Sequence, residues 1–178
     1  MTNTEIIKEL SNGNKIKQKA LEKLLITDIN KFHRKAYQNN RIKHHLRGHN
    51  NLHTELLNDL IKDKDYLIRA SFSSYHSLNT KQIKTLSKDN NYFVKQELAN
   101  RTDLELDVLL TLTKDSEDQI RVNLAKNNSI KDKKIICILC KDLDLDVRIE
   151  MLKRKDLTHN NIKTLMSFDD FEEYLHHI

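Results

Sequence analysis

The chain has 178 residues, of which 32% are charged, with two glycines and no proline, a composition typical of short helices joined by polar turns. No segment approaches the ~20 apolar residues of a membrane span, and two cysteines give no disulfide framework, so we expect a cytoplasmic protein without membrane contact. The positive charge is uneven, because residues 1–51 contain 11 Lys and Arg against 4 Asp and Glu, whereas residues 52–178 contain 20 against 22.

Residues 1–51 are predicted to form a degenerate amino-terminal cap. Apolar residues recur at helical spacing in residues 2–10 and again in residues 15–26, which predicts two short amphipathic helices. Residues 42–52 match the second half of the repeat that follows, and Gly48 is placed to end a short helix there. We therefore expect an inserted half-unit, which breaks the even stacking of the array.

From Leu52 onward the chain repeats one unit. Five rows start 26, 26, 26 and 27 residues apart, at Leu52, Leu78, Leu104, Ile130 and Leu157. Fixed apolar columns at such a period predict a solenoid, because each unit can bury its apolar face only against its neighbours. We expect two helices per row, for example at residues 80–87 and 92–100. One domain over residues 1–178 would hold regular repeats at 52–166 and an acidic capping tail at 167–178.

Two charged columns run through the regular rows. Each row has a Lys-Asp pair at the turn between its helices, and a Lys or Arg follows the aspartate by six residues. The members of the two columns are Asp63 and Arg69, Asp89 and Lys95, Asp115 and Arg121, and Asp142 and Arg148. Asp65, Asn91 and Asp144 are predicted to cap the second helices of their rows, whereas Glu117 is a poor cap.

The repeat over residues 52–166 resembles the leucine-rich-repeat variant family and, more broadly, the HEAT class of helical repeats. The pattern is set out by Leu104, Leu109, Leu112, Lys114, Asp115, Ile120, Arg121, Leu124, Ala125 and Asn127. The resemblance implies an all-α fold, a right-handed α-solenoid of short helix pairs with a repeat of about 26 residues. It also implies that the two charged columns form a structural ladder between neighbouring units. The cysteine cluster that holds an iron–sulfur centre in one branch of the family is absent, so we expect no cofactor.

The sequence contains no recognisable catalytic set or glycine-rich phosphate loop, so we expect a non-enzymatic scaffold that binds a protein or peptide on its concave face. Four polar second-helix residues in one column are expected to face this groove: Ser71, Glu97, Asn123 and Glu150. The alternative is a HEAT-like nucleic-acid-binding protein, with a role in DNA repair, that uses its basic amino-terminal part. Its phosphate contacts would be Arg34, Arg41, Lys43 and Arg47, with Lys126, Lys153, Arg154 and Lys155 along one edge.

Two further groups of residues are weighed as ligand sites. Histidines at helical spacing can share a metal, but no fourth ligand can be named, so we favour a polar cap surface over a metal site. These histidines are His33, His44, His45, His49 and His53. Cys137 and Cys140 have C-x-x-C spacing within an apolar helix, where thiols pack as small hydrophobes, so we expect no metal or redox site there.

Overall fold

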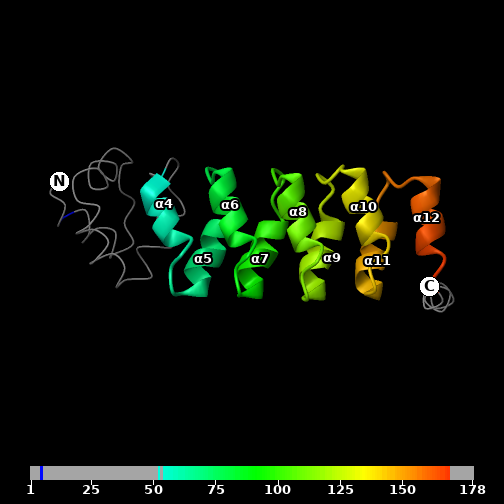
Figure 1. The fold of residues 1–178 in the computed structure, drawn as a ribbon, viewed down its shortest axis with the longest axis horizontal. Coiled ribbons are helices and arrows are strands. Elements are labelled where there is room, and N and C mark those ends of the chain that lie inside the picture. Colours follow the sequence, from blue (N-terminus) through cyan, green and yellow to red (C-terminus); the bar gives the residue numbers. More distant parts are fainter. Residues whose placement is uncertain (1–4, 6–51, 53, 169–178) are drawn as a thin grey trace. The chain divides into compact units, whose positions relative to one another are not determined.

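The computed structural model describes Glu5, Leu52 and residues 54–168, and the helices of this part of the chain are short and joined by turns (Figure 1). Every regular element between residues 54 and 168 is an α-helix of seven to nine residues. The all-α class is thus confirmed for these residues. Within the same residues, no helix has the length and apolar character needed to cross a membrane. The predicted helices and half-unit of residues 1–51 lie outside the described residues.

The chain divides into two compact units, and the first is Met1–Leu86. Its described helices are α4 (Thr54–Leu60), α5 (Tyr66–Ser73) and α6 (Thr80–Leu86). Helix α5 contacts both α4 and α6. Tyr75, just beyond α5, is buried, and its hydroxyl accepts a hydrogen bond from the Leu52 N–H at 3.1 Å. This bond attaches the connection after α5 to the start of the same row.

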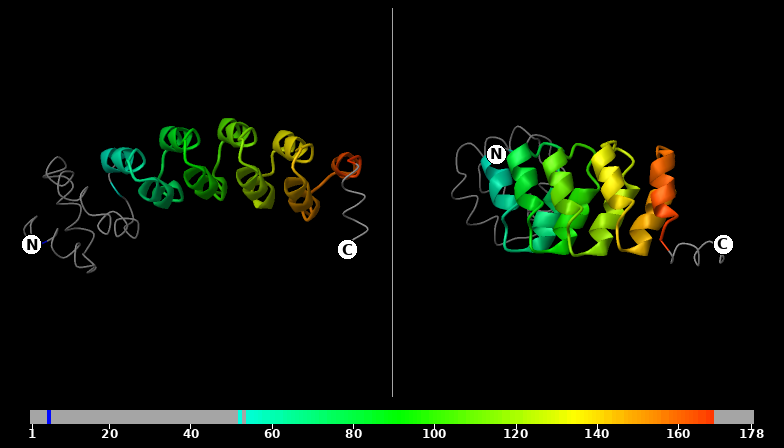
Figure 2. Two further views of the ribbon diagram at one scale, coloured as in Figure 1. Left: turned by 90° about the horizontal axis from the view of Figure 1, so that it is seen from below. Right: turned by 45° about the vertical axis from the view of Figure 1, so that its right-hand side comes forward.

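The second compact unit is Ser87–Ile178. Its described helices are α7 (Tyr92–Ala99), α8 (Leu106–Leu112), α9 (Asp118–Lys126), α10 (Lys133–Leu139), α11 (Leu145–Leu152) and α12 (His159–Leu165). Helices α7, α9 and α11 lie side by side in one layer, with α9 in contact with both of the others, and α8 and α10 lie in the other layer (Figure 2). The second helices α7, α9 and α11 therefore pack against their neighbours in the layer as well as against the helices next to them along the chain.

Each second helix begins directly after its N-capping residue. The Asp65 carboxylate accepts a hydrogen bond from the Leu67 N–H at 2.9 Å, and Asp144 accepts from the Val147 N–H at 3.2 Å. Asn91 caps α7 in the same way, whereas Glu117 makes no side-chain cap bond. All four expectations are confirmed, since a short oxygen-bearing side chain can reach the exposed N–H groups of the first turn and a glutamate there does not.

The repeated apolar columns form the interior of each unit. In three of these columns no member is more than 1% exposed. In the first unit these are Leu60, Ile68, Phe72 and Leu86, and in the second they are Val94, Leu98, Leu112, Ile120, Leu124, Leu139, Val147 and Met151. Full burial of such a side chain stabilises the folded state by ~1.5–3 kcal/mol. Burial of these columns holds the short helices together, because isolated helices of this length are unstable in water.

Candidate partner-binding surface

The polar column predicted to face a groove lies on the second helices. Glu97, Asn123 and Glu150 stand on α7, α9 and α11, which the second unit places side by side. Glu97 is exposed and Glu150 is half-buried. Ser71 belongs to the first unit, where it is half-buried and its hydroxyl donates to the Ile68 carbonyl at 2.8 Å.

Asn123 is the most covered member of the column, with 9% of its surface exposed. Its amide oxygen accepts a hydrogen bond from Gln119 Nε2 at 3.1 Å, and Val122 beside it is also buried. Asn123 is covered because α9 lies between α7 and α11, and a side chain on a middle helix loses solvent contact on both sides. The more accessible members of this column therefore stand on α7 and α11, the outer helices of the layer.

At one end of the layer, the Glu150 carboxylate lies between two lysines. Lys153 Nζ donates to Glu150 Oε1 at 2.7 Å, and Lys126 Nζ is 4.0 Å from the same oxygen. Both lysines are more than half exposed. Exposed pairs of this kind contribute only ~0–1 kcal/mol, so Glu150 can exchange a lysine for a cation of a partner at small cost.

At the other end of the layer, two aromatic residues open helix α7. Tyr92 and Phe93 are both exposed, Phe93 to 41%, and their ring centroids are 3.9 Å apart. Phe93 and Glu97 are four residues apart and thus lie on the same side of the helix. Exposed aromatic residues on a rigid helix are the usual anchors of a protein interface.

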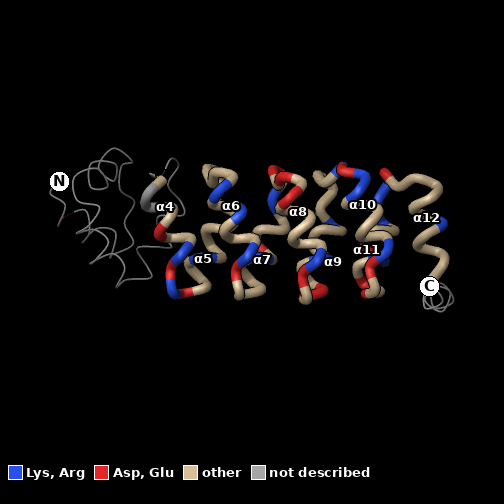
Figure 3. Tube along the Cα trace, in the orientation of Figure 1, with Lys and Arg blue, Asp and Glu red and all other residues tan. Residues whose placement is uncertain are grey.

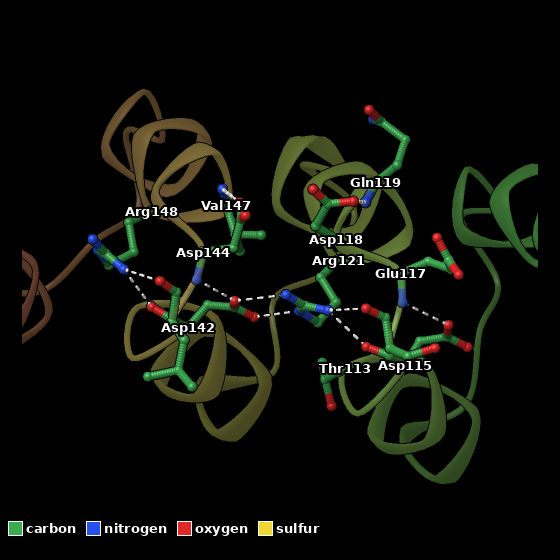
Figure 4. Close-up of polar contacts among 12 residues, drawn as sticks. Thr113, Asp115, Glu117, Asp118, Gln119, Arg121, Asp142, Asp144, Val147 and Arg148 are labelled. Atoms are coloured by element: carbon green, nitrogen blue, oxygen red, sulfur yellow. Dashed lines mark hydrogen bonds and ion pairs between the residues drawn. The ribbon is translucent and has the colours of Figure 1, made fainter.

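The charged columns meet at the turns that lead into α9 and α11, where Figure 3 shows acidic and basic residues close together. Arg121 donates from Nε and Nη2 to the two Asp142 carboxylate oxygens, at 2.8 and 3.1 Å (Figure 4). Its third group, Nη1, donates to the Asp115 carbonyl at 2.7 Å. Asp142 also accepts a hydrogen bond from the Asp144 N–H at 3.0 Å. One guanidinium thus joins the turn of its own row to the turn of the next.

Other members of the charged columns make parts of the same arrangement. Lys95 Nζ pairs with Asp115 Oδ2 at 2.5 Å, which again joins one row to the next. Arg69 and Arg148 donate to the carbonyls of Asp63 and Asp142, both at 2.7 Å, within their own turns. The Asp63 and Asp89 carboxylates accept from the N–H groups two residues later, at 2.9 Å. These groups are occupied by contacts inside the fold.

The last described residue, Phe168, lies against the charged column. Its ring stands 4.1 Å below the Arg148 guanidinium carbon, a cation–π contact. Arg148 is buried, so this ring helps to cover a charge that carboxylates approach in the earlier rows. Phe168 thus covers Arg148, and the capping tail stays a prediction because residues 169–178 lie outside the described residues.

A second set of hydrogen bonds, at the loops that follow the second helices, was not predicted. Asn127 Nδ2 donates to the carbonyls of Ala99 and Arg101, at 2.9 and 2.7 Å. Arg154, one row later, donates to the carbonyls of Ala125, Asn127 and Ile130, at 3.3, 3.0 and 2.6 Å. Arg154 is 7% exposed, so the prediction that it lines a basic edge was wrong. The sequence did contain a signal for these arginines, because Arg101 and Arg154 are each followed two residues later by an aspartate. Each arginine pairs with that aspartate.

Several pKa values reflect these contacts. Hydrogen bonds from Arg154 and Lys131 hold the pKa of Asp156 well below its usual range, and Arg101 lowers the pKa of Asp103 in the same way. Hydrogen bonds to Asp142 raise the pKa of Arg121. These shifts belong to ion pairs that fix loops and turns, and none of them marks a group poised for proton transfer.

The two cysteines differ in their surroundings. Cys140 is fully buried, and burial raises the pKa of its thiol to about 11. Cys137 is half-buried. A buried thiol of high pKa is a poor nucleophile and a poor metal ligand, so Cys140 acts as a small core residue. Among the described residues no group of three or more His, Cys, Asp or Glu side chains is arranged to hold a metal ion.

The amino-terminal residues of the two remaining hypotheses lie outside the described part of the chain. For nucleic acid these are Arg34, Arg41, Lys43 and Arg47, and for a metal they are His33, His44, His45, His49 and His53. Where the chain is described, short stacked helices with contacts to the second neighbour are consistent with a helical repeat. Comparison with known proteins found no family model, curated protein or solved structure that matches the chain.

Proposed function

We propose that the chain is a non-enzymatic helical-repeat scaffold that binds a protein or peptide on the face formed by its second helices. The proposed architecture is a right-handed α-solenoid with a repeat of about 26 residues, and the positions of the second-helix N-caps are in keeping with it. These caps are Asp65, Asn91, Glu117 and Asp144. Solenoids bind partners through extended curved surfaces of this kind.

The observation that carries the proposal is the aromatic pair at the start of α7, on the same layer as the exposed Glu97 and the half-buried Glu150. Tyr92 and Phe93 expose ring surface that a folded chain gains by covering, and Glu97 lies one turn further along the same side. Glu150 lies on α11, beyond the intervening helix α9. A ligand spanning the layer would therefore meet an apolar anchor first and a carboxylate afterwards.

This order of groups defines the chemistry of the partner. An apolar or aromatic side chain would pack on Phe93, and Lys or Arg side chains would pair with Glu97 and Glu150. Basic residues of the partner would replace the exposed Lys153 at Glu150, as the weak pairing there allows. The proposed partner is thus a segment with an apolar residue followed by basic ones.

The test is affinity capture from a native lysate with the wild type and two double variants, followed by mass spectrometry. In the first variant, Phe93→Ala and Glu97→Ala remove the anchor and the adjacent carboxylate. The matched control carries Leu106→Ala and Glu105→Ala, which remove an apolar residue that is 44% exposed and an exposed carboxylate at the start of α8, in the other layer. We expect proteins captured by the wild type and the control to be lost, about 10-fold or more, with the first variant.

Two results would refute the proposal. One is capture that the first variant and the control retain equally, since the second-helix face would then play no part. The other is recovery of nucleic acid, removable by nuclease, as the main bound material. That second result would support the alternative of a nucleic-acid-binding protein acting through Arg34, Arg41, Lys43 and Arg47.

A further inference from the structure

A hollow of about 300 Å³ lies at the loops that follow α9 and α11. It is lined by Asn128, Lys131, Lys153, Lys155 and Asp156. All of these residues belong to the second compact unit, and none of them stands on α7, although Lys153 also pairs with Glu150. Three ammonium groups and one carboxylate therefore share a single concave site.

The Asp156 carboxylate in this hollow is already neutralised by a buried arginine. Arg154 donates to Asp156 from Nε at 3.0 Å and from Nη2 at 2.9 Å, with the arginine side chain almost fully buried. Lys131 Nζ makes a further bond to the same carboxylate at 2.9 Å. Asp156 carries one negative charge and pairs with two cations, Arg154 and Lys131. This group of three side chains therefore keeps one net positive charge. Lys155 adds another ammonium group from the exposed surface of the loop.

A hollow at the preceding pair of loops has a different lining. Its volume is about 250 Å³, and beside Arg101 and Lys131 the lining includes Leu104, Leu106 and Leu109 together with Ile130. Arg101 is buried and pairs with Asp103, and Lys131 lines both hollows. Lys153 and Lys155 therefore distinguish the later hollow, whereas the earlier one has leucine and isoleucine side chains.

We propose that the hollow lined by Lys131, Lys153 and Lys155 binds a small ligand that carries phosphate groups. Lysine ammonium groups bind phosphate oxygens as point charges, and the Asn128 side-chain amide adds a neutral donor. Lys131 pairs with Asp156 and Lys153 with Glu150. With Arg154 and Lys155, the four cations around the hollow still exceed these two carboxylates, which favours a multiply charged anion over a single carboxylate. A volume near 300 Å³ is at the lower end for small-molecule sites, which suits a diphosphate-sized group.

The proposal is tested with inorganic pyrophosphate as the probe, in an NMR titration of the ¹⁵N-labelled full chain at about 50 mM salt. We expect saturable shifts at the backbone amides of residues 126–131 and 153–156. The variant Lys131→Gln/Lys155→Gln should weaken binding about 10-fold or more, since each lysine would lose a charge-assisted hydrogen bond. The control Lys141→Gln removes an exposed lysine from the turn at the opposite end of the helix pair and should leave the affinity unchanged.

The folded state of the variant is verified by its melting temperature, and Asp156 retains its arginine partner in it. Absence of localised shifts would overturn the proposal, as would equal weakening by Lys131→Gln/Lys155→Gln and by Lys141→Gln. A single-stranded oligonucleotide provides the remaining arm. If it binds more tightly than pyrophosphate and shifts the amides around Leu104 and Leu106 as well, the site is part of a polymer-binding edge and the small-ligand proposal is wrong.

Discussion

The second unit uses different chemistry at the turns into its second helices and at the loops that follow them. At the turns, Arg121 pairs with the carboxylate of Asp142 in the next row. At the loops, Asn127 and Arg154 donate to main-chain carbonyls of the preceding row. The turn arrangement needs complementary side chains in two rows, whereas the loop arrangement needs only one suitable donor.

This difference explains which positions repeat in the sequence. The aspartate and its Lys or Arg recur in every regular row because each depends on the other. The loop position holds Asn127 in one row and Arg154 in the next, since a carbonyl oxygen accepts equally from an amide or a guanidinium. The Asp and Lys or Arg pairs can therefore be recognised in the sequence as repeated columns. The donors to backbone carbonyls cannot, because the residue type at their position changes from row to row.

The largest effect is expected from Arg154→Ala. Its side chain is 2% exposed and donates to three carbonyls and to Asp156, so its loss removes a donor from four acceptor groups at once. We expect the free energy of unfolding to fall by about 3 kcal/mol, measured by urea denaturation. Arg154→Lys keeps the charge but not the fork of donors and should recover only part of the loss. Full recovery by lysine would mean that charge, not carbonyl bonding, is what the loop requires.

A smaller effect is expected at the turn, from Arg121→Ala. The change removes both bonds to Asp142 and the bond to the Asp115 carbonyl, but water reaches this site more readily because the arginine is 15% exposed. We expect a loss of about 2 kcal/mol. Lys126→Ala, an exposed neighbour on the same helix, should cost less than about 0.5 kcal/mol and is the matched control. Equal melting temperatures for the two variants would show that the turn pairs do not stabilise the array.

The smallest effect concerns pH and Asp156. Arg154 and Lys131 lower the pKa of this carboxyl in the folded state, so its contribution is present above the unfolded pKa of ~3.9 and is lost as the pH falls below it. We expect Asp156→Asn to be destabilising at pH 7, by less than about 1 kcal/mol, and to flatten the loss of stability below pH ~4. Asp146→Asn, exposed on α11, is the control. Parallel pH curves for wild type and Asp156→Asn would contradict the assignment.

Much of the fold could be predicted from local signals. The caps at Asp65, Asn91 and Asp144 and the core columns through Ile120 and Leu124 follow from rules that act within one turn of helix or one face of it. The burial of Arg154 could not be predicted this way, because its carbonyl partners are more than 20 residues distant in the chain. The charge of Arg154 suggested a surface position, and nothing within one helical turn of it indicated that the side chain would be buried.

The sequence by itself determined where the described helices begin and which residues are buried in them, because capping and apolar periodicity are local properties repeated in every row. Only the tertiary structure decided which polar groups remain available to a partner. Asn123 is covered because α9 lies between two helices, while Lys131, Lys153 and Lys155 come together because loops from successive rows meet. Availability depends on what neighbouring rows place over a side chain, and that information is spread over residues far apart in the chain.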